Sequence, residues 1–204
     1  MSRRFVVTAG ALVAVAVVAT ALAMRGAGIT ANRQASTLEQ HVARRVWRFL
    51  IPASSRTAVN PVPLTPIVLD EARTHWADHC ASCHGNDGTG TTPVGRHVFP
   101  PAPDMRTAST QNLTDGELFY AIEQGIPWTA MPAWSTGTSE GAQESWALVH
   151  FIRHLPRLMP DEVKEMERFN PRSPADEQRE RDIDDFLKGP KSPDPRGGRG
   201  GGPS

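Results

Sequence analysis

The sequence predicts an all-α protein, and three features of its 204 residues support this fold class. An apolar run of about 20 residues near the N-terminus is long enough for a helix that spans a bilayer. Signals that start helices recur along the chain: capping boxes at residues 36–39 and 114–117, and Thr65-Pro66, an N-cap followed by proline. Apolar residues after the first capping box recur at the three- and four-residue spacing of a helix.

Cys80-Ala81-Ser82-Cys83-His84 is the most informative stretch. Two thiols three positions apart, with an imidazole directly after the second, fit covalent attachment of a c-type haem. Each thiol can form a thioether with one haem vinyl group, and this holds the adjacent His84 under the iron as an axial ligand. The chain has two cysteines, so the motif accounts for both and predicts one haem c.

Two other interpretations of the cysteines have weaker support. A thioredoxin-like redox pair would need a βαβ pattern nearby, whereas the residues before Cys80 have a helical pattern. A structural zinc site would need a second ligand pair at matching spacing, which the sequence lacks. His75 and His79 lie one helical turn apart, but without a nearby carboxylate–histidine pattern we expect them to be solvated or packed rather than metal ligands.

A methionine in a Pro- and Trp-rich loop, Met131, is the candidate for the second axial position. Its thioether is a soft, neutral ligand, and His/Met ligation raises the potential of a haem. Trp128 and Trp134 flank it, and we expect both to close over the haem edge, with plain core packing as the alternative. His150 and His154 are alternative ligands, but histidines one turn apart on a helix face are more often surface residues.

These motifs resemble class I cytochrome c, the monohaem type with His/Met ligation, over residues 64–158. The matching residues are the Cys80–Gly85 stretch and Met131-Pro132. Ala72 and Trp76 lie eight and four residues before Cys80, where the family has a small and an aromatic residue. Phe151 fits the aromatic of the family's last helix that packs against that pair. The resemblance implies a class I cytochrome c fold, with helices around one covalent haem.

The resemblance also implies a partner for the proximal histidine. In the family, a proline carbonyl accepts the Nδ1 proton of the axial histidine, and Pro103 is our candidate for that proline, with Pro101 next. Such a bond fixes the ring orientation and tunes the basicity of the ligand. Met105 is a rival axial ligand, but it lies where the family has an apolar packing residue, and we expect it in the core.

The residues that begin and end helices predict three helices in the haem domain. They cover residues 66–83, 115–124 and 143–155, with loops at 85–99 and 135–139. Gly125 is well placed as a C-cap.

The formal net charge is zero, but the charge is unevenly distributed. Residues 1–62 contain eight arginines and one acidic residue, residues 64–158 contain five arginines and ten acidic residues, and the remainder has a net charge of −2. A basic arm beside an apolar run suggests contact with a membrane, and an acidic haem domain argues against nucleic acid as a partner.

Residues 1–24 are predicted to be a signal-anchor or transmembrane segment, with the apolar run from Phe5 to Met24. Ala21-Leu22-Ala23 is also a possible cleavage site for a signal peptide, which would release a secreted, periplasmic protein. We favour an uncleaved anchor, because the run exceeds a usual signal-peptide core. Five arginines after the run oppose the positive-inside rule. Haem attachment takes place outside the cytoplasm, and this decides the orientation.

Residues 25–63 are predicted to form a basic amphipathic arm and a Pro-rich linker. A helix from Ser36 to about Leu50 carries apolar residues on one face with arginines between them, so it can lie on lipid headgroups or dock on the haem domain. Residues 52–66 should form an extended linker. Residues 159–188 should form a charged helical extension, and residues 189–204, rich in Gly and Pro, should be disordered.

The function favoured by these features is a monohaem electron carrier on the outer face of a bacterial cytoplasmic membrane. Ligation by His84 and Met131 would leave no open iron position for a substrate, so no enzymatic activity is expected. Its partners would be a redox donor, a redox acceptor and the membrane. The first alternative is a subunit of a larger membrane oxidase or dehydrogenase. A peroxidase with a labile Met131 is a second, with no distal catalytic His or Arg pairing to support it.

Overall fold

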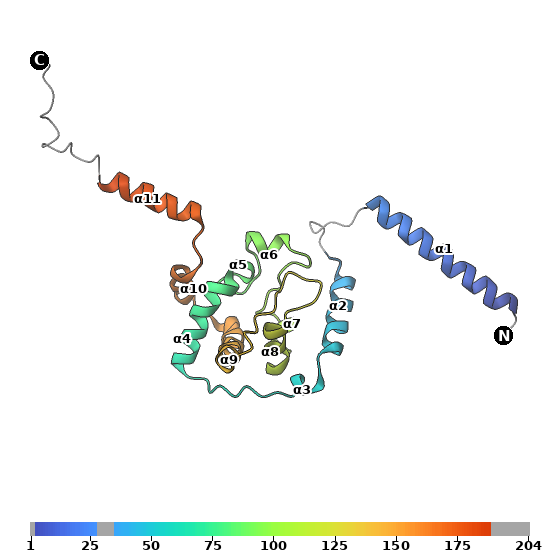
Figure 1. The fold of residues 1–204 in the computed structure, drawn as a ribbon, viewed down its shortest axis with the longest axis horizontal. Helices are drawn as coiled ribbons and strands as arrows, with labels where there is room; N and C mark the ends of the chain where they lie inside the picture. Colours follow the sequence, from blue (N-terminus) through green and yellow to red (C-terminus); the bar gives the residue numbers. More distant parts are fainter. Residues whose placement is uncertain (1–2, 28–34, 189–204) are drawn as a thin grey trace, which may run out of the picture.

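The computed structural model describes residues 3–27 and 35–188, and the predicted disordered tail lies outside these residues. The described residues form helices and no strand, as predicted for an all-α protein (Figure 1). The helices, in chain order, are α1 (Arg3–Ala27), α2 (Thr37–Leu50), α3 (Ala53–Arg56), α4 (Pro66–His75), α5 (Ala81–His84), α6 (Pro93–His97), α7 (Ala108–Gln111), α8 (Asp115–Gln124), α9 (Ser139–His154), α10 (Pro160–Met166) and α11 (Pro174–Lys188).

The centre of the fold is the contact between α4, with the turn that follows it, and α9. The Trp76 and Phe151 rings lie 5.4 Å apart between centroids, and the two side chains are 2% and 0% exposed. Ala72 is buried beside them, where a larger side chain would hold the helices apart. The predicted contact between the first and last helices of the haem domain is therefore present.

The N-terminal caps predicted from the sequence are confirmed. The Thr65 hydroxyl accepts a hydrogen bond from the backbone N–H of Val68. Both sides of the capping box are formed at the start of α8, between Thr114 and Glu117. Gly125 ends α8 with a φ of +67°, a backbone conformation that favours glycine.

The helix expected over residues 66–83 is present, and it contains a π-helical turn at Trp76–Cys80 that accommodates one extra residue per turn next to the cysteines. Three other local predictions are wrong. The helix expected over residues 143–155 begins four residues earlier, at Ser139. The loop expected at 85–99 contains α6, whose start has the same Thr-Pro signal as α4. The linker expected to be extended contains α3, a single turn that begins after Pro52.

The segment before α4 lies on the domain rather than away from it. Asn60 donates a hydrogen bond from its side chain to the Trp146 carbonyl, 2.9 Å away. The carbonyl of Val62 lies 2.7 Å from Nε2 of His150. These bonds hold the end of the arm against α9.

The C-terminal extension begins packed and ends exposed. Met166, at the end of α10, is fully buried, and Arg73 of α4 forms ion pairs with Glu162 and Glu165. α11 buries no residue and projects from the domain (Figure 1).

Candidate haem-binding site

The cysteine motif forms the end of the first helical segment of the domain. Cys80 closes the π-helical turn, while Cys83 and His84 belong to α5, and both thiols are free of disulfides. Burial, and next the neighbouring Cys83, raises the pKa of the Cys80 thiol to about 12. Redox-active pairs have the opposite property, a thiol with a lowered pKa, so this environment argues against a thioredoxin-like function.

Hydrogen bonds from three directions fix the backbone around His84. Trp76 Nε1 donates to the carbonyl of Gly85 at 2.9 Å, and the N–H of Gly90 donates to the carbonyl of His84 at 2.8 Å. The Thr92 hydroxyl donates to the carbonyl of Ser82 at 2.8 Å. The backbone at His84 is therefore held in place by the protein itself.

Sequence reasoning missed two residues that shape this turn, Thr92 and Gly95. Besides its bond to Ser82, the Thr92 hydroxyl accepts the N–H of Gly95 at 2.8 Å and so starts α6 against the motif. A Cβ at Gly95 would lie 2.2 Å from the carbonyl oxygen of Cys83, so this close approach requires glycine. The Thr92-Pro93 pair was the available signal, because it repeats the Thr65-Pro66 start.

The His84 imidazole has the properties that an iron ligand needs. Burial lowers its pKa to about 4, so the ring is neutral at neutral pH and carries a free lone pair. Its Nδ1 is buried and has no hydrogen-bond partner among the described residues. The predicted bond to the Pro103 carbonyl is thus not formed in this structure, and Pro103 itself is exposed.

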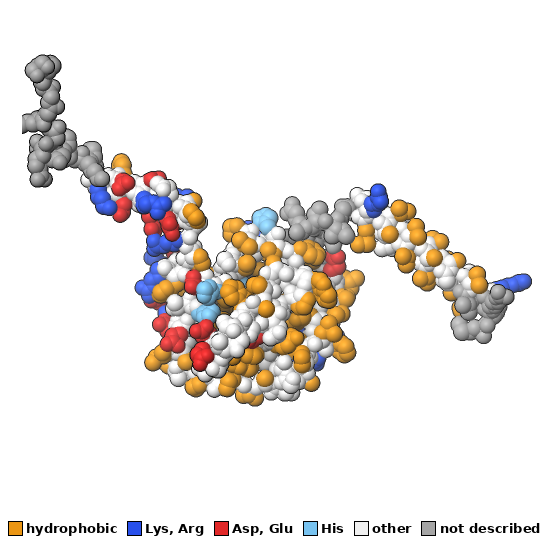
Figure 2. All heavy atoms as spheres, in the orientation of Figure 1, with side chains coloured by type: hydrophobic (Ala, Val, Ile, Leu, Met, Phe, Trp, Pro, Cys, Tyr) orange, Lys and Arg blue, Asp and Glu red, His pale blue; other side chains and the backbone are white. Residues whose placement is uncertain are grey.

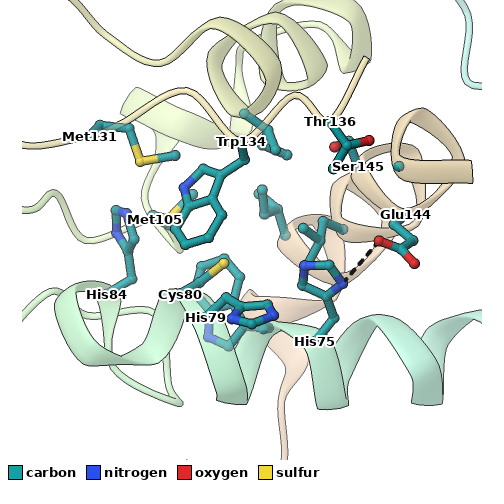
Figure 3. A pocket seen from close by; sticks show the side chains of 15 residues that line it. His75, His79, Cys80, His84, Met105, Met131, Trp134, Thr136, Glu144 and Ser145 are labelled. Atoms are coloured by element: carbon teal, nitrogen blue, oxygen red, sulfur yellow. Dashed lines mark ion pairs between the residues drawn. The ribbon is translucent and has the colours of Figure 1, made fainter. Parts of the chain in front are cut away.

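A cavity of about 190 Å³ brings the candidate ligands together. Figure 3 shows His84 and Met131 on facing walls at one end of it, with Cys80 nearby. Its inner wall is apolar and includes Ile122 and Ile152. An imidazole, a thioether and a thiol line one end of this largely apolar cavity, and these donor types suit a covalently bound haem.

The loop that carries Met131 is fixed to the end of α8. The N–H of Trp134 donates to the carbonyl of Ile122 at 3.0 Å, and the N–H of Ile126 donates to the carbonyl of Met131 at 3.1 Å. A Cβ at Gly125 would lie 2.7 Å from the backbone nitrogen of Ala133, which explains the need for glycine where the loop returns. The distal candidate is therefore on an ordered loop.

The two flanking tryptophans take different positions. Trp134 lines the cavity, and its ring lies 5.6 Å from that of His79. Trp128 is 90% exposed and does not line the cavity, and it is the only non-glycine residue of the described chain with a positive φ, +59°. The structure brings Trp134 to the site and places Trp128 on the surface.

Of the rival ligands, Met105 lies at the site and the two histidines of α9 do not. Met105 lines the same cavity as Met131 and packs against the core (Figure 3). His150 and His154 lie elsewhere: His150 is beside the Val62 carbonyl, and Nε2 of His154 is 3.1 Å from Glu162. The described residues contain no group of three or more His, Cys, Asp or Glu that could hold a metal ion, and this includes the surroundings of His75 and His79.

A comparison with known families agrees with this geometry. Residues 68–152 match the family model described as cytochrome c oxidase, cbb3-type, subunit III. The match covers less than half of the chain and includes the cysteine motif, the Met131 loop and most of α9. Residues 68–152 therefore form a c-type cytochrome domain.

Proposed function

We propose that this chain is a monohaem, one-electron carrier held on the outer face of a bacterial cytoplasmic membrane. The observation that carries the proposal is the cavity that brings His84, Met131 and Cys80 together. When bound, the haem supplies a reversible one-electron couple between ferric and ferrous iron. The side chains and backbone of the protein would bind the haem and keep its ligands in place.

Each site residue has a distinct role in this proposal. Cys80 and Cys83 would hold the haem covalently, so that it would stay bound in both oxidation states. His84, neutral because it is buried, would offer a nitrogen lone pair to the iron, and Met131 would offer a soft thioether. Trp134 would cover the edge of the cavity that it lines.

The coordination proposed here supports a carrier rather than an enzyme. With both His84 and Met131 bound, the iron would have no open position for a substrate. The backbone bonds around His84 and along the Met131 loop keep both ligands in place, which lowers the reorganisation that electron transfer requires. A haem edge near Trp134 would be the point of electron entry and exit.

The location follows from α1 and from the chemistry of attachment. Val7–Gly26 is long and apolar enough to cross a membrane, with a mean hydropathy of 2.3, and none of it is buried against the rest of the described chain. Attachment of haem c takes place outside the cytoplasm, so the domain belongs on the outer side of the membrane. A secreted form cleaved near Ala23 is the alternative.

The family match favours a second candidate function: a cytochrome subunit of a membrane oxidase. The haem chemistry would be the same, but the partner would be permanent. The exposed helix α11, with Ile183, Phe186 and Leu187 on its surface, would be available for docking. Mild detergent extraction separates the two functions, because a carrier elutes near its own mass and a subunit elutes with its complex.

A redox titration followed by optical spectra tests the proposal on the purified protein. We expect one haem per chain, a single one-electron transition and spectra of six-coordinate iron in both oxidation states. More than one haem per chain would contradict the monohaem assignment. Binding of carbon monoxide by the reduced native protein would show an open iron position and favour an enzyme.

A further inference from the structure

One face of α2 has no partner among the described residues. It consists of five apolar side chains, each at least half exposed: Leu38, Val42, Val46, Phe49 and Leu50. We call this set the α2 apolar face. Figure 2 shows hydrophobic side chains gathered over this side of the domain. Phe49 is 79% exposed, an unusual position for a phenylalanine unless something covers it.

The haem domain contacts α2 on a different side from the α2 apolar face. Arg48 donates two hydrogen bonds from its guanidinium to the Glu117 carboxylate, at 3.0 and 2.9 Å, and Glu117 is 2% exposed. Ile51, directly after the helix, is also 2% exposed, and Arg56 donates to its carbonyl. The expectation that the apolar face itself docks on the haem domain is therefore wrong.

The position of α2 in the chain limits what can cover this face. Nine residues, 28–36, separate the end of α1 from the start of α2. A fully extended chain spans at most about 3.5 Å per residue, so α2 begins within about 35 Å of the end of α1. If α1 crosses the bilayer, α2 is confined to the region next to the bilayer surface.

The charges around the face suit a lipid headgroup. At about 100° per residue, Arg45 lies about 70° from the centre of the α2 apolar face, where a long cationic side chain reaches headgroup phosphates. Arg44 lies about 180° from that centre and points away. Up to residue 62 the chain carries eight arginines and one acidic residue, which attracts it to an anionic surface.

We propose that α2 lies in the headgroup region of an anionic bilayer, with the α2 apolar face toward the acyl chains and Arg45 at the phosphates. The proposal rests on the proposed anchoring by α1. Because Arg48 and Glu117 join α2 to α8, whose Ile122 lines the haem cavity, this contact fixes the orientation of the cavity relative to the membrane. The site of electron entry would then lie at a defined height above the bilayer, facing the redox partners.

Spin labels on the full chain test the proposal directly. We would attach a nitroxide at Val42→Cys and Phe49→Cys, with Arg44→Cys as the control on the opposite side of the same helix. Each variant is reconstituted with haem into vesicles of phosphatidylcholine and phosphatidylglycerol. Collision with oxygen, which concentrates in lipid, is compared with collision with a water-soluble nickel chelate.

The expected result is several-fold greater oxygen-to-nickel collision ratios at positions 42 and 49 than at position 44. Adding Arg45→Glu should reduce this difference. Equal ratios at all three positions would overturn the proposal. Shielding of positions 42 and 49 from both reagents would indicate a protein partner on the face and would overturn it as well.

Two measurements on the same samples separate this proposal from the proposed function. The optical spectrum reports whether haem is attached, and the intact mass reports whether α1 is retained. If α1 is absent, the anchoring has failed, and the labelled mature chain is then mixed with the same vesicles. Lipid contact at positions 42 and 49 would still support the role of α2, and its absence would refute it.

Discussion

The rings of Trp76 and Phe151 lie 5.4 Å apart and join the helix that carries the cysteine motif to α9. Trp76 also lies 5.7 Å from the His84 ring and donates from Nε1 to the carbonyl of Gly85. One side chain therefore links the core contact of the fold to the ring of the proposed proximal ligand, His84, and to the backbone of the next residue, Gly85. Substitution of Trp76 should therefore affect both the stability of the fold and the position of His84.

Trp76→Ala should lower the free energy of unfolding by about 3–5 kcal/mol, the range for removal of a buried tryptophan. Trp76→Phe keeps a ring against Phe151 but loses the hydrogen bond to Gly85, and should cost about 1 kcal/mol for that bond in addition to a smaller packing loss. Denaturant unfolding of the haem-loaded protein, followed by circular dichroism, measures both. Equal losses for the two variants would contradict the importance of the ring contact.

The helices with local start signals could be predicted from the sequence, and those that depend on the surrounding fold could not. The Thr114–Glu117 capping box lies within four residues, so the start of α8 can be read directly. Glu117 also binds Arg48, 69 residues away, and no local pattern reveals this. The sequence suggested only the cap, whereas the structure shows a carboxylate that both caps α8 and holds α2.

The candidate site, too, could be predicted from the sequence only in part. The cysteine motif predicts haem attachment because spacing and residue type are sufficient for that chemistry. The direction of a side chain in a loop depends on backbone angles that the sequence does not specify. This explains why Trp134 and Trp128, both expected over the haem, differ in the structure, and why Met105 reaches the cavity beside Met131.

Covalent attachment predicts that acidified acetone leaves the colour with the native protein. In the double variant Cys80→Ala, Cys83→Ala, the thioethers cannot form and extraction should remove the haem completely. The pyridine haemochrome spectrum before and after extraction measures this. Ser82→Ala, within the same turn, is the matched control and should retain the haem. Free extraction from the native protein would disprove attachment.

An uncleaved anchor predicts that the mature protein still contains residues 5–24. N-terminal sequencing and intact mass of protein purified from its own membrane test this. The apolar run is longer than a usual signal-peptide core, so we expect the full chain. A mature N-terminus at Met24, directly after Ala21-Leu22-Ala23, would instead identify a secreted protein.

The bond between Arg48 and Glu117 predicts a pH-dependent contribution to stability. Desolvation acts to raise the pKa of Glu117, but hydrogen bonds from Arg48 and Thr114 and the charges of Arg48 and Arg56 lower it overall, below the ordinary value of 4.5. A carboxyl whose pKa is lower in the folded state stabilises the fold at neutral pH. That contribution is lost as the pH falls below 4.5 through the folded-state pKa.

Glu117→Gln should therefore lower the free energy of unfolding at neutral pH by about 2 kcal/mol, the scale of hydrogen bonds to a charged group. The difference from the native protein should shrink at acidic pH, where the native carboxylate is protonated. Glu71→Gln, at an exposed position of α4, is the control and should change little at either pH. A difference that is constant with pH would show that the ion pair does not contribute.

Met131 and Met105 line the same cavity, so each of them is a candidate for the distal ligand. We expect Met131 to bind the iron, since Pro127 and Pro132 restrict its loop and lower the entropy lost when the thioether is held. Its loop is also hydrogen-bonded to the end of α8, whereas Met105 packs against the core. Oxidised native protein should show the weak sulfur-to-iron absorption band in the far red.

Three variants separate the two methionines. Met131→His should keep six-coordinate iron and lower the midpoint potential, because imidazole favours ferric iron more than a thioether does. Met131→Ala should abolish the far-red band. Met105→Leu preserves the packing volume and should leave both the band and the potential nearly unchanged. If the band survives in Met131→Ala and disappears in Met105→Leu, Met105 is the ligand, and the chain must reach the second haem face from the segment between α6 and α7 rather than from the loop after α8.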